Sequence, residues 1–126
     1  MNRQEHLLTI LGEEGVEVAQ RCSKALRFGL SEIQPGQELT NAQRIRGEYI
    51  DLLAVMRMLV EEGAIEPVTN DDLPVMEQKR QKVEKFLVYS RECGTLTDES
   101  DYQRGYDAGV SDGLDSAAED AAGASM

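Results

Sequence analysis

Apolar residues recur at three-, four- and seven-residue steps along the first 28 residues, and polar residues fill the positions between them. This spacing places the apolar side chains on one face of a helix. The stripe comprises Leu7, Ile10, Leu11, Val18, Ala25 and Phe28. We therefore predict one long helix over residues 2–28 with Gly29 as its C-cap. Residues 31–39, which include a Pro-Gly step, are predicted to form a loop.

A second helix is predicted from Thr40 to Glu62. Thr40 followed by Gln43 has the pattern of a capping box at a helix N-terminus, and Gly63 marks the end. The segment between them is apolar on nearly every side. Helices of this kind are buried, so we expect the second helix to be enclosed by its neighbours.

A third helix is predicted after a linker over residues 64–70. Asp71 or Asp72 can cap it, Pro74 fits its first turn, and Gly94 follows its last apolar residues. No segment has the alternation of a strand, so the sequence predicts an all-α helical bundle.

Charge divides the 126-residue chain into two predicted parts. Residues 97–126 carry eight acidic residues and one basic residue, a net of −7 out of the total of −11, which leaves −4 for residues 1–96. We interpret residues 1–96 as the helical domain and 97–126 as an acidic tail rich in Gly, Ala and Asp, partly helical or disordered. This acidity disfavours binding to a nucleic acid polymer.

Other whole-chain features point to a cytoplasmic protein. No apolar run approaches the roughly 18 residues of a membrane span, and the N-terminus lacks a signal-peptide pattern. Cys22 and Cys93 have neither CxxC spacing nor a histidine cluster, so they are predicted to be reduced thiols, with Cys22 filling space in the core.

Carboxylates supply the main chemical signal. Residues three apart share a helix face, so Glu14 and Glu17 point together, and Glu48 and Asp51 do the same. Both pairs have apolar neighbours on their faces, and burying such groups is costly without a cation. The sequence therefore predicts a site for Mg²⁺ or another oxygen-loving cation. Glu13, at the edge of the first pair, could bind a metal or accept a proton from water.

Two other interpretations of these carboxylates remain open. Either pair could belong to a solvated acidic face, as charge runs often do. A ferritin-like di-iron site is the other carboxylate site found in bundles, but it requires Glu-x-x-His motifs, and no histidine follows either pair.

Basic residues near the carboxylates are candidates for phosphate binding. Arg21 and Lys24 share a helix side with Glu17, although pairing with Glu17 or a role in solubility would also explain them. On the third helix, Lys82, Lys85 and Arg91 could reach a phosphate or form a solvated basic face.

A Glu-Glu-x-x-Glu motif followed after 30 residues by Glu-x-x-Asp resembles the signature of the MazG-like all-α nucleoside triphosphate pyrophosphohydrolases. The likeness covers roughly residues 7–96 and is closest to small single-domain members from phages and bacteria. It extends to four further strings of sequence: Ser23–Gly29, Gln34–Gln37, Leu39–Asn41 and Lys82–Arg91.

The resemblance implies cleavage of a (d)NTP between its α and β phosphates, which yields a (d)NMP and pyrophosphate. It implies two or three Mg²⁺ or Mn²⁺ ions per site, with Glu14, Glu17, Glu48 and Asp51 as ligands and Glu13 as a ligand or water-orienting group. The nucleotide contacts that the resemblance implies are Lys24, Asn41, Lys82, Lys85 and Arg91, among which Asn41 is expected to contact the sugar or base. Arg21 is added as a substrate-binding candidate because of its position on the side of the helix that carries Glu17.

Family members assemble as homodimers or homotetramers, and some phage-type members prefer a purine such as (d)GTP. A phage-encoded member would act in the host cytoplasm. This chain departs from the pattern at Gly15, where the family usually has a side chain, and in the tail.

Three alternatives are kept beside the main hypothesis. One is a dUTP-type or house-cleaning nucleotide diphosphatase of the same superfamily. Another is a catalytically silent helical module that senses nucleotides. The third, resting on the charge of the tail alone, is an acidic decoy for a basic protein.

Overall fold

A computed structural model describes residues 1–97. It contains three α-helices and one short 3₁₀ helix: α1 (Arg3–Phe28), α2 (Asn41–Glu61), η1 (Asn70–Asp72) and α3 (Leu73–Glu92). The described residues form no strand, only an isolated antiparallel bridge in the loop between α1 and α2. The all-α prediction is therefore confirmed, and the predicted structure of the acidic tail lies outside the described residues apart from Thr97.

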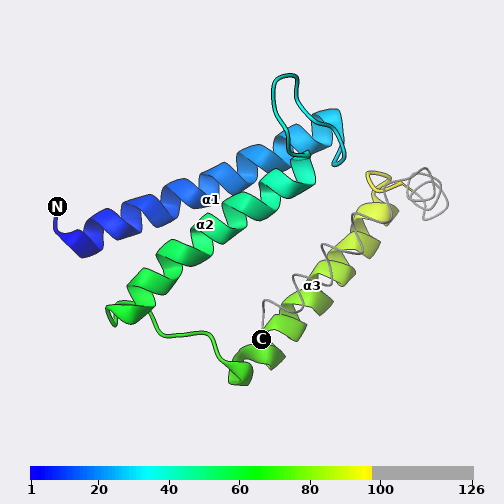
Figure 1. The fold of residues 1–126 in the computed structure, drawn as a ribbon. Coiled ribbons are helices and arrows are strands. Elements are labelled where there is room, and N and C mark those ends of the chain that lie inside the picture. Colours follow the sequence, from blue (N-terminus) through cyan, green and yellow to red (C-terminus); the bar gives the residue numbers. More distant parts are fainter. Residues whose placement is uncertain (98–126) are drawn as a thin grey trace. The chain divides into compact units, whose positions relative to one another are not determined.

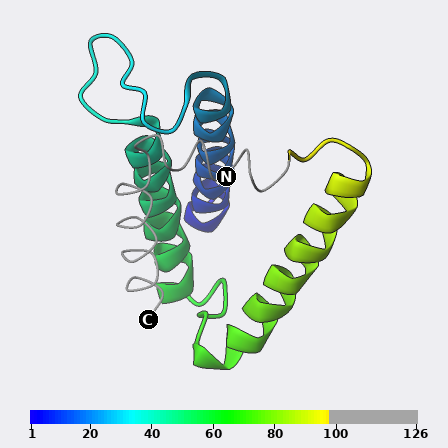
Figure 2. The same cartoon turned by 90° about the vertical axis from the view of Figure 1, so that its right-hand side faces the viewer.

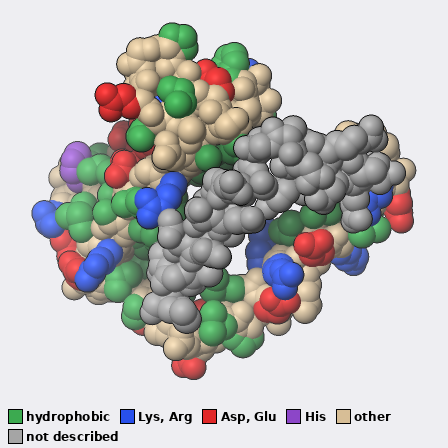
Figure 3. Space-filling view, turned by 45° about the vertical axis from the view of Figure 1, so that its right-hand side comes forward, with side chains coloured by type: hydrophobic (Ala, Val, Ile, Leu, Met, Phe, Trp, Pro, Cys, Tyr) green, Lys and Arg blue, Asp and Glu red, His purple; other side chains and the backbone are tan. Residues whose placement is uncertain are grey.

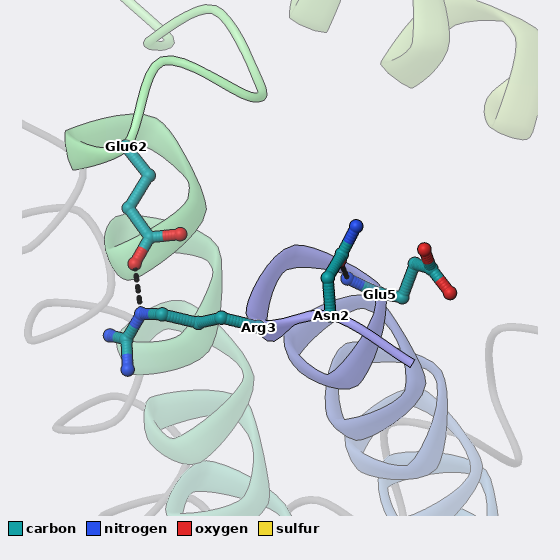
Figure 4. A network of polar contacts seen from close by, with 4 residues as sticks. All are labelled: Asn2, Arg3, Glu5 and Glu62. Carbon is teal, nitrogen blue, oxygen red and sulfur yellow. Dashed lines mark hydrogen bonds and ion pairs between the residues drawn. The ribbon is translucent and has the colours of Figure 1, made fainter.

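The chain divides into two units, residues 1–67 and 68–126. In the first unit, α1 and α2 lie side by side as an antiparallel hairpin (Figures 1 and 2). An ion pair between Arg3 and Glu62 joins the start of α1 to the end of α2 (Figure 4). The Asn2 side chain caps α1 by accepting a hydrogen bond of 2.8 Å from the backbone N–H of Glu5.

The caps predicted for this hairpin are present. Gly29 adopts a φ of +98°, which a side chain would disfavour, and its N–H donates to the carbonyl of Ala25 at 2.8 Å. At the start of α2, the Gln43 N–H donates to Thr40 Oγ1 at 3.1 Å, and the Thr40 N–H donates to Gln43 Oε1 at 2.9 Å. This reciprocal pair is the predicted capping box.

Burial shows which residues form the seam between α1 and α2. The least exposed positions along each helix alternate in steps of four and three, as in helices packed at a shallow angle. The seam positions of α1 are Leu7, Leu11, Glu14, Val18, Arg21 and Ala25, and those of α2 are Asn41, Ile45, Glu48, Leu52, Val55 and Leu59. Most of them are apolar. The four polar seam residues, which require a separate explanation, are Glu14, Arg21, Asn41 and Glu48.

Two expectations about the core were wrong. Phe28, at the end of the predicted stripe, is 58% exposed, because α1 ends there. Cys22 is also exposed, because the seam passes through the neighbouring position Arg21.

The prediction that α2 is enclosed is also wrong for the described residues. Tyr49, Ile50 and Leu53 are 41–49% exposed. Within residues 1–67 only α1 packs along this helix, so its other apolar faces stay accessible. Figure 3 shows many hydrophobic side chains at the surface among the charged ones.

The second unit begins with η1 and α3. The Thr69 N–H donates to Asp72 Oδ2 at 2.8 Å, so the Asp72 side chain caps η1. Asp72 is also the N-cap residue of α3, but its side chain makes no capping hydrogen bond to that helix. Pro74 lies in the first turn of α3, as predicted. No residue of α3 is buried, and Val83, Phe86 and Leu87 are among its exposed apolar side chains. Among the described helices, none has the length and apolar character needed to cross a membrane.

Candidate metal centre

Three of the predicted carboxylates converge at the seam of the hairpin. Glu14 comes from α1, and Glu48 and Asp51 come from successive turns of α2. One oxygen atom from each lies within 4.8 Å of the other two. Mg²⁺ binds oxygen at about 2.0–2.1 Å, so ligands on opposite sides of one ion are roughly 4 Å apart. The three side chains therefore need only small adjustments to share a cation.

Their surroundings are partly shielded from water. Glu14 and Glu48 are half-buried at seam positions, whereas Asp51 is exposed at the edge. A cation held here would have protein oxygens on one side and access for water or substrate on the other. Mg²⁺ commonly keeps such open positions for phosphates and water.

Electrostatic repulsion acts on Glu14. Its pKa is raised above the ordinary value of 4.5, first by partial burial and then by the charges of Asp51, Glu17, Glu48 and Glu13. Burial and neighbouring negative charge both disfavour the ionised form. A bound dication would reverse this effect because it favours the charged carboxylate.

Glu13 and Glu17 lie on α1 next to this cluster, and both are exposed. Neither belongs to the group of three oxygens within 4.8 Å, although both charges act on Glu14. The structure thus brings three of the four predicted metal ligands together and leaves Glu17 at the periphery.

Arg21 is the cation beside the cluster. Its Nε lies 3.5 Å from Glu48 Oε1, in a partly buried pair between α1 and α2. The Arg21 Nη1 atom is buried and has no hydrogen-bond partner among residues 1–97. The sequence also allowed Arg21 to pair with Glu17. In the structure Arg21 pairs with Glu48 across the seam instead.

A pocket of about 240 Å³ lies near the end of the hairpin where α1 runs into the loop. It is lined by Lys24, Phe28, Glu32, Gln34, Pro35 and Asn41. With a rise of about 1.5 Å per residue, Lys24 lies roughly 15 Å along α1 from Glu14, and Asn41 lies roughly 10 Å along α2 from Glu48. The separation is comparable to the length of an extended nucleoside triphosphate.

Asn41 is a buried wall of this pocket, with 4% of its surface exposed. Its Nδ2 donates to the carbonyl of Gly29 at 2.8 Å and to Glu32 Oε2 at 2.7 Å. Two acceptors on one nitrogen fix the orientation of the amide. Both N–H groups are used within the protein, so any contact from Asn41 to a ligand must come from its oxygen.

The remaining predicted site residues, Lys82, Lys85 and Arg91, lie on α3 in the second unit and are exposed. The prediction that they bind phosphate stays a prediction.

Sequence reasoning missed two parts of the site. It did not single out Phe28, Glu32, Gln34 and Pro35 as pocket residues, although the Gln-Pro-Gly string was part of the family likeness. It also missed Glu48 as the partner of Arg21. The alternation of seam positions in steps of four and three was the available signal, because it places Arg21 and Glu48 on facing sides.

Searches against protein-family models, curated proteins and solved structures find no significant match for this chain. The resemblance to the MazG-like family therefore rests on the motifs themselves.

Proposed function

We propose that this chain is a divalent-metal-dependent nucleoside triphosphate pyrophosphohydrolase that converts a (d)NTP to a (d)NMP and pyrophosphate. The observation that carries the proposal is the convergence of Glu14, Glu48 and Asp51 from two helices within 4.8 Å. The spacing of these residues also matches the MazG-like signature. Water would add to a phosphorus of the α–β anhydride as the bridging P–O bond breaks.

Mg²⁺ or Mn²⁺ fits the all-carboxylate donor set. When bound, such ions would neutralise the triphosphate and promote ionisation of water. Glu14, Glu48 and Asp51 would hold the first ion. Glu17, one helical turn after Glu14, would join when the phosphates bring a second or third ion. Glu13 is proposed to accept the proton of the attacking water or to bind an outer ion.

The pocket next to Lys24 and Asn41 is proposed to hold the nucleoside. Phe28 offers an exposed ring for stacking, and Lys24, which also lines the pocket, is proposed to contact a phosphate. Lys82, Lys85 and Arg91 are proposed as further phosphate contacts on the family resemblance alone.

A purine such as (d)GTP is the proposed preference. Glu32 lines the pocket and is half-buried, and one of its oxygens already accepts from Asn41. An ionised carboxylate only accepts hydrogen bonds, so it favours a base edge with adjacent donors. Guanine offers a ring N–H next to an exocyclic amine. Uracil offers a single N–H between two carbonyl acceptors, so this feature disfavours a dUTP-type enzyme.

Exposed apolar surface supports assembly as a homodimer or homotetramer. Tyr49, Ile50 and Leu53 on α2 are exposed, and so are Phe86 and Leu87 on α3. Most of the stability of helices in proteins comes from packing of their apolar faces, and exposed apolar surface of this kind often marks an interface. Packing between copies would complete an all-α bundle of the kind the resemblance implies.

The experiment is a screen of all eight common (d)NTPs with Mg²⁺ or Mn²⁺ and detection of pyrophosphate. We expect release of pyrophosphate with a preference for guanine nucleotides, and Glu32→Gln should reduce that preference. Glu38→Gln, an exposed change in the same loop, is the matched control. Nucleotide binding without turnover would instead indicate the nucleotide-sensing module, and neither binding nor turnover would reject both.

A further inference from the structure

Arg21 occupies a position in the seam that an apolar residue would ordinarily fill. Its side chain is 24% exposed, and that of its partner Glu48 is 14% exposed. The described ion pairs at other places on the chain are far more open, such as Arg57–Glu61 with exposures of 82% and 66%. Shielding from solvent strengthens the Coulomb attraction between Arg21 and Glu48 relative to a surface pair, at the cost of removing both charges from water.

The arginine uses only part of its hydrogen-bonding capacity in this contact. A guanidinium has five N–H donors in a rigid planar fork. The Nε–H is directed at Glu48, while Nη1 is buried and has no partner in the part of the chain that the structure describes. A buried charged donor without an acceptor is unfavourable, so Nη1 is available for an acceptor other than those that residues 1–97 provide.

The contact between Arg21 and Glu48 suggests the chemical class of that acceptor. Arg21 is held against Glu48, and Glu48 is one of the three clustered carboxylates proposed to bind a cation. Anionic phosphate oxygens are expected beside that cation, and arginine binds them through charge-assisted hydrogen bonds.

We propose that Arg21 couples the metal site to the substrate, with Nε holding Glu48 in place and Nη1 donating to a non-bridging phosphate oxygen. This inference rests on the proposed function. It goes beyond a simple phosphate contact because the same guanidinium also positions a metal ligand. The consequence is reciprocal: bound phosphate strengthens cation binding, and a bound cation strengthens phosphate binding.

The test compares Arg21→Met and Arg21→Lys with the unaltered chain by titration calorimetry. The probes are Mn²⁺ alone, an α,β-methylene nucleoside triphosphate alone, and each in the presence of the other. We expect Arg21→Met to weaken binding of the analogue at saturating Mn²⁺ by at least about tenfold, the value of a charged hydrogen bond. The factor by which the analogue enhances Mn²⁺ affinity should fall as well.

The variant Arg21→Lys distinguishes the effect of the positive charge from the effect of contacting Glu48 and a phosphate at the same time. A lysine ammonium is a point charge that cannot span the two acceptors as a guanidinium does. It should recover part of the affinity for the analogue but not the mutual enhancement. Arg57→Met removes an exposed pair of the same type on α2 and is the control.

Three results would overturn the inference. If Arg21→Met lowers the urea midpoint but leaves both affinities unchanged, Arg21 is only structural. Full recovery of the mutual enhancement by Arg21→Lys would show that positive charge alone suffices. If the unaltered chain binds neither Mn²⁺ nor the analogue, the proposed function fails, and the inference fails with it.

Discussion

Polar residues interrupt the apolar seam between α1 and α2 at two places, and the two places differ in how far their hydrogen-bonding groups are satisfied. At one end, Asn41 is buried and both of its amide hydrogens reach acceptors at 2.7 and 2.8 Å. In the middle, three carboxylates lie close together, and the neighbouring Arg21 has a buried nitrogen for which no described residue is a partner. The buried amide that supports the fold is thus satisfied by neighbouring residues, whereas the groups in the middle are not all satisfied within residues 1–97. This contrast is what the proposed cation and phosphate would explain.

If the clustered carboxylates bind a cation and do not support the fold, removing one of them should strongly reduce activity without unfolding the protein. Glu48→Gln and Asp51→Asn should each reduce pyrophosphate release by at least about 100-fold, since even the loss of residues that only support metal ligands costs about 10–100-fold. Circular dichroism should show an unchanged helix content. Activity near that of the unaltered chain would contradict the assignment of these residues as ligands.

Asn41→Ala should show the opposite behaviour, with a large loss of stability. The change removes two hydrogen bonds from a buried amide and leaves Gly29 O and Glu32 with unmet acceptors, which costs about 2–3 kcal/mol. Urea unfolding at a fixed protein concentration measures this loss. Asn70→Ala, at an exposed position in η1, is the control and should have little effect. Equal midpoints for the two variants would show that the Asn41 network does not hold the loop.

Glu14→Gln should raise the stability of the metal-free protein at neutral pH. The folded-state pKa of Glu14 lies above its ordinary value of 4.5, so the folded chain binds this proton more tightly than the unfolded chain does. Stability therefore falls as the pH rises through the folded-state pKa, and it recovers as the pH falls toward 4.5.

Thermal unfolding between pH 4 and 8 measures this effect. The advantage of the Gln variant should be largest at neutral pH and vanish near the ordinary pKa. Added Mn²⁺ should stabilise the unaltered chain more than the variant. An advantage that does not change with pH would show that repulsion within the cluster is not its cause.

Gly15→Ala should produce the smallest effect, a modest stabilisation. A Cβ at Gly15 would meet only Leu52 Cδ1 at 4.0 Å, which is ordinary van der Waals contact. The gain should be about 0.5–1 kcal/mol from helix propensity, measured by urea unfolding. Destabilisation would indicate that another surface approaches α1 closely at this point.

Local signals in the sequence predicted most of the helical structure. The capping box at Thr40 and the glycine at position 29 are short-range features whose geometry depends on neighbouring residues, and both appear as expected. The pairing of Glu48 and Asp51 follows from helical periodicity. These features need no knowledge of tertiary contacts.

Features that depend on tertiary packing were harder to predict. The apolar composition of α2 indicated burial, but one neighbouring helix can cover only one face, so Ile50 and Leu53 stay exposed. The pocket depends on the path of the loop after Gly29, which has no periodicity to reveal it. The partner of Arg21 depends on how the two helices are aligned, and local spacing equally allowed Glu17.

The most direct test of a cation site at the seam is calorimetric titration of Mn²⁺ into the metal-free chain and into Glu48→Gln. We predict saturable binding to the unaltered chain and binding at least about tenfold weaker to the variant, because one of the three converging carboxylates loses its negative charge. If the unaltered chain takes up no Mn²⁺, or if both proteins bind it equally, the carboxylates at the seam are not a metal centre.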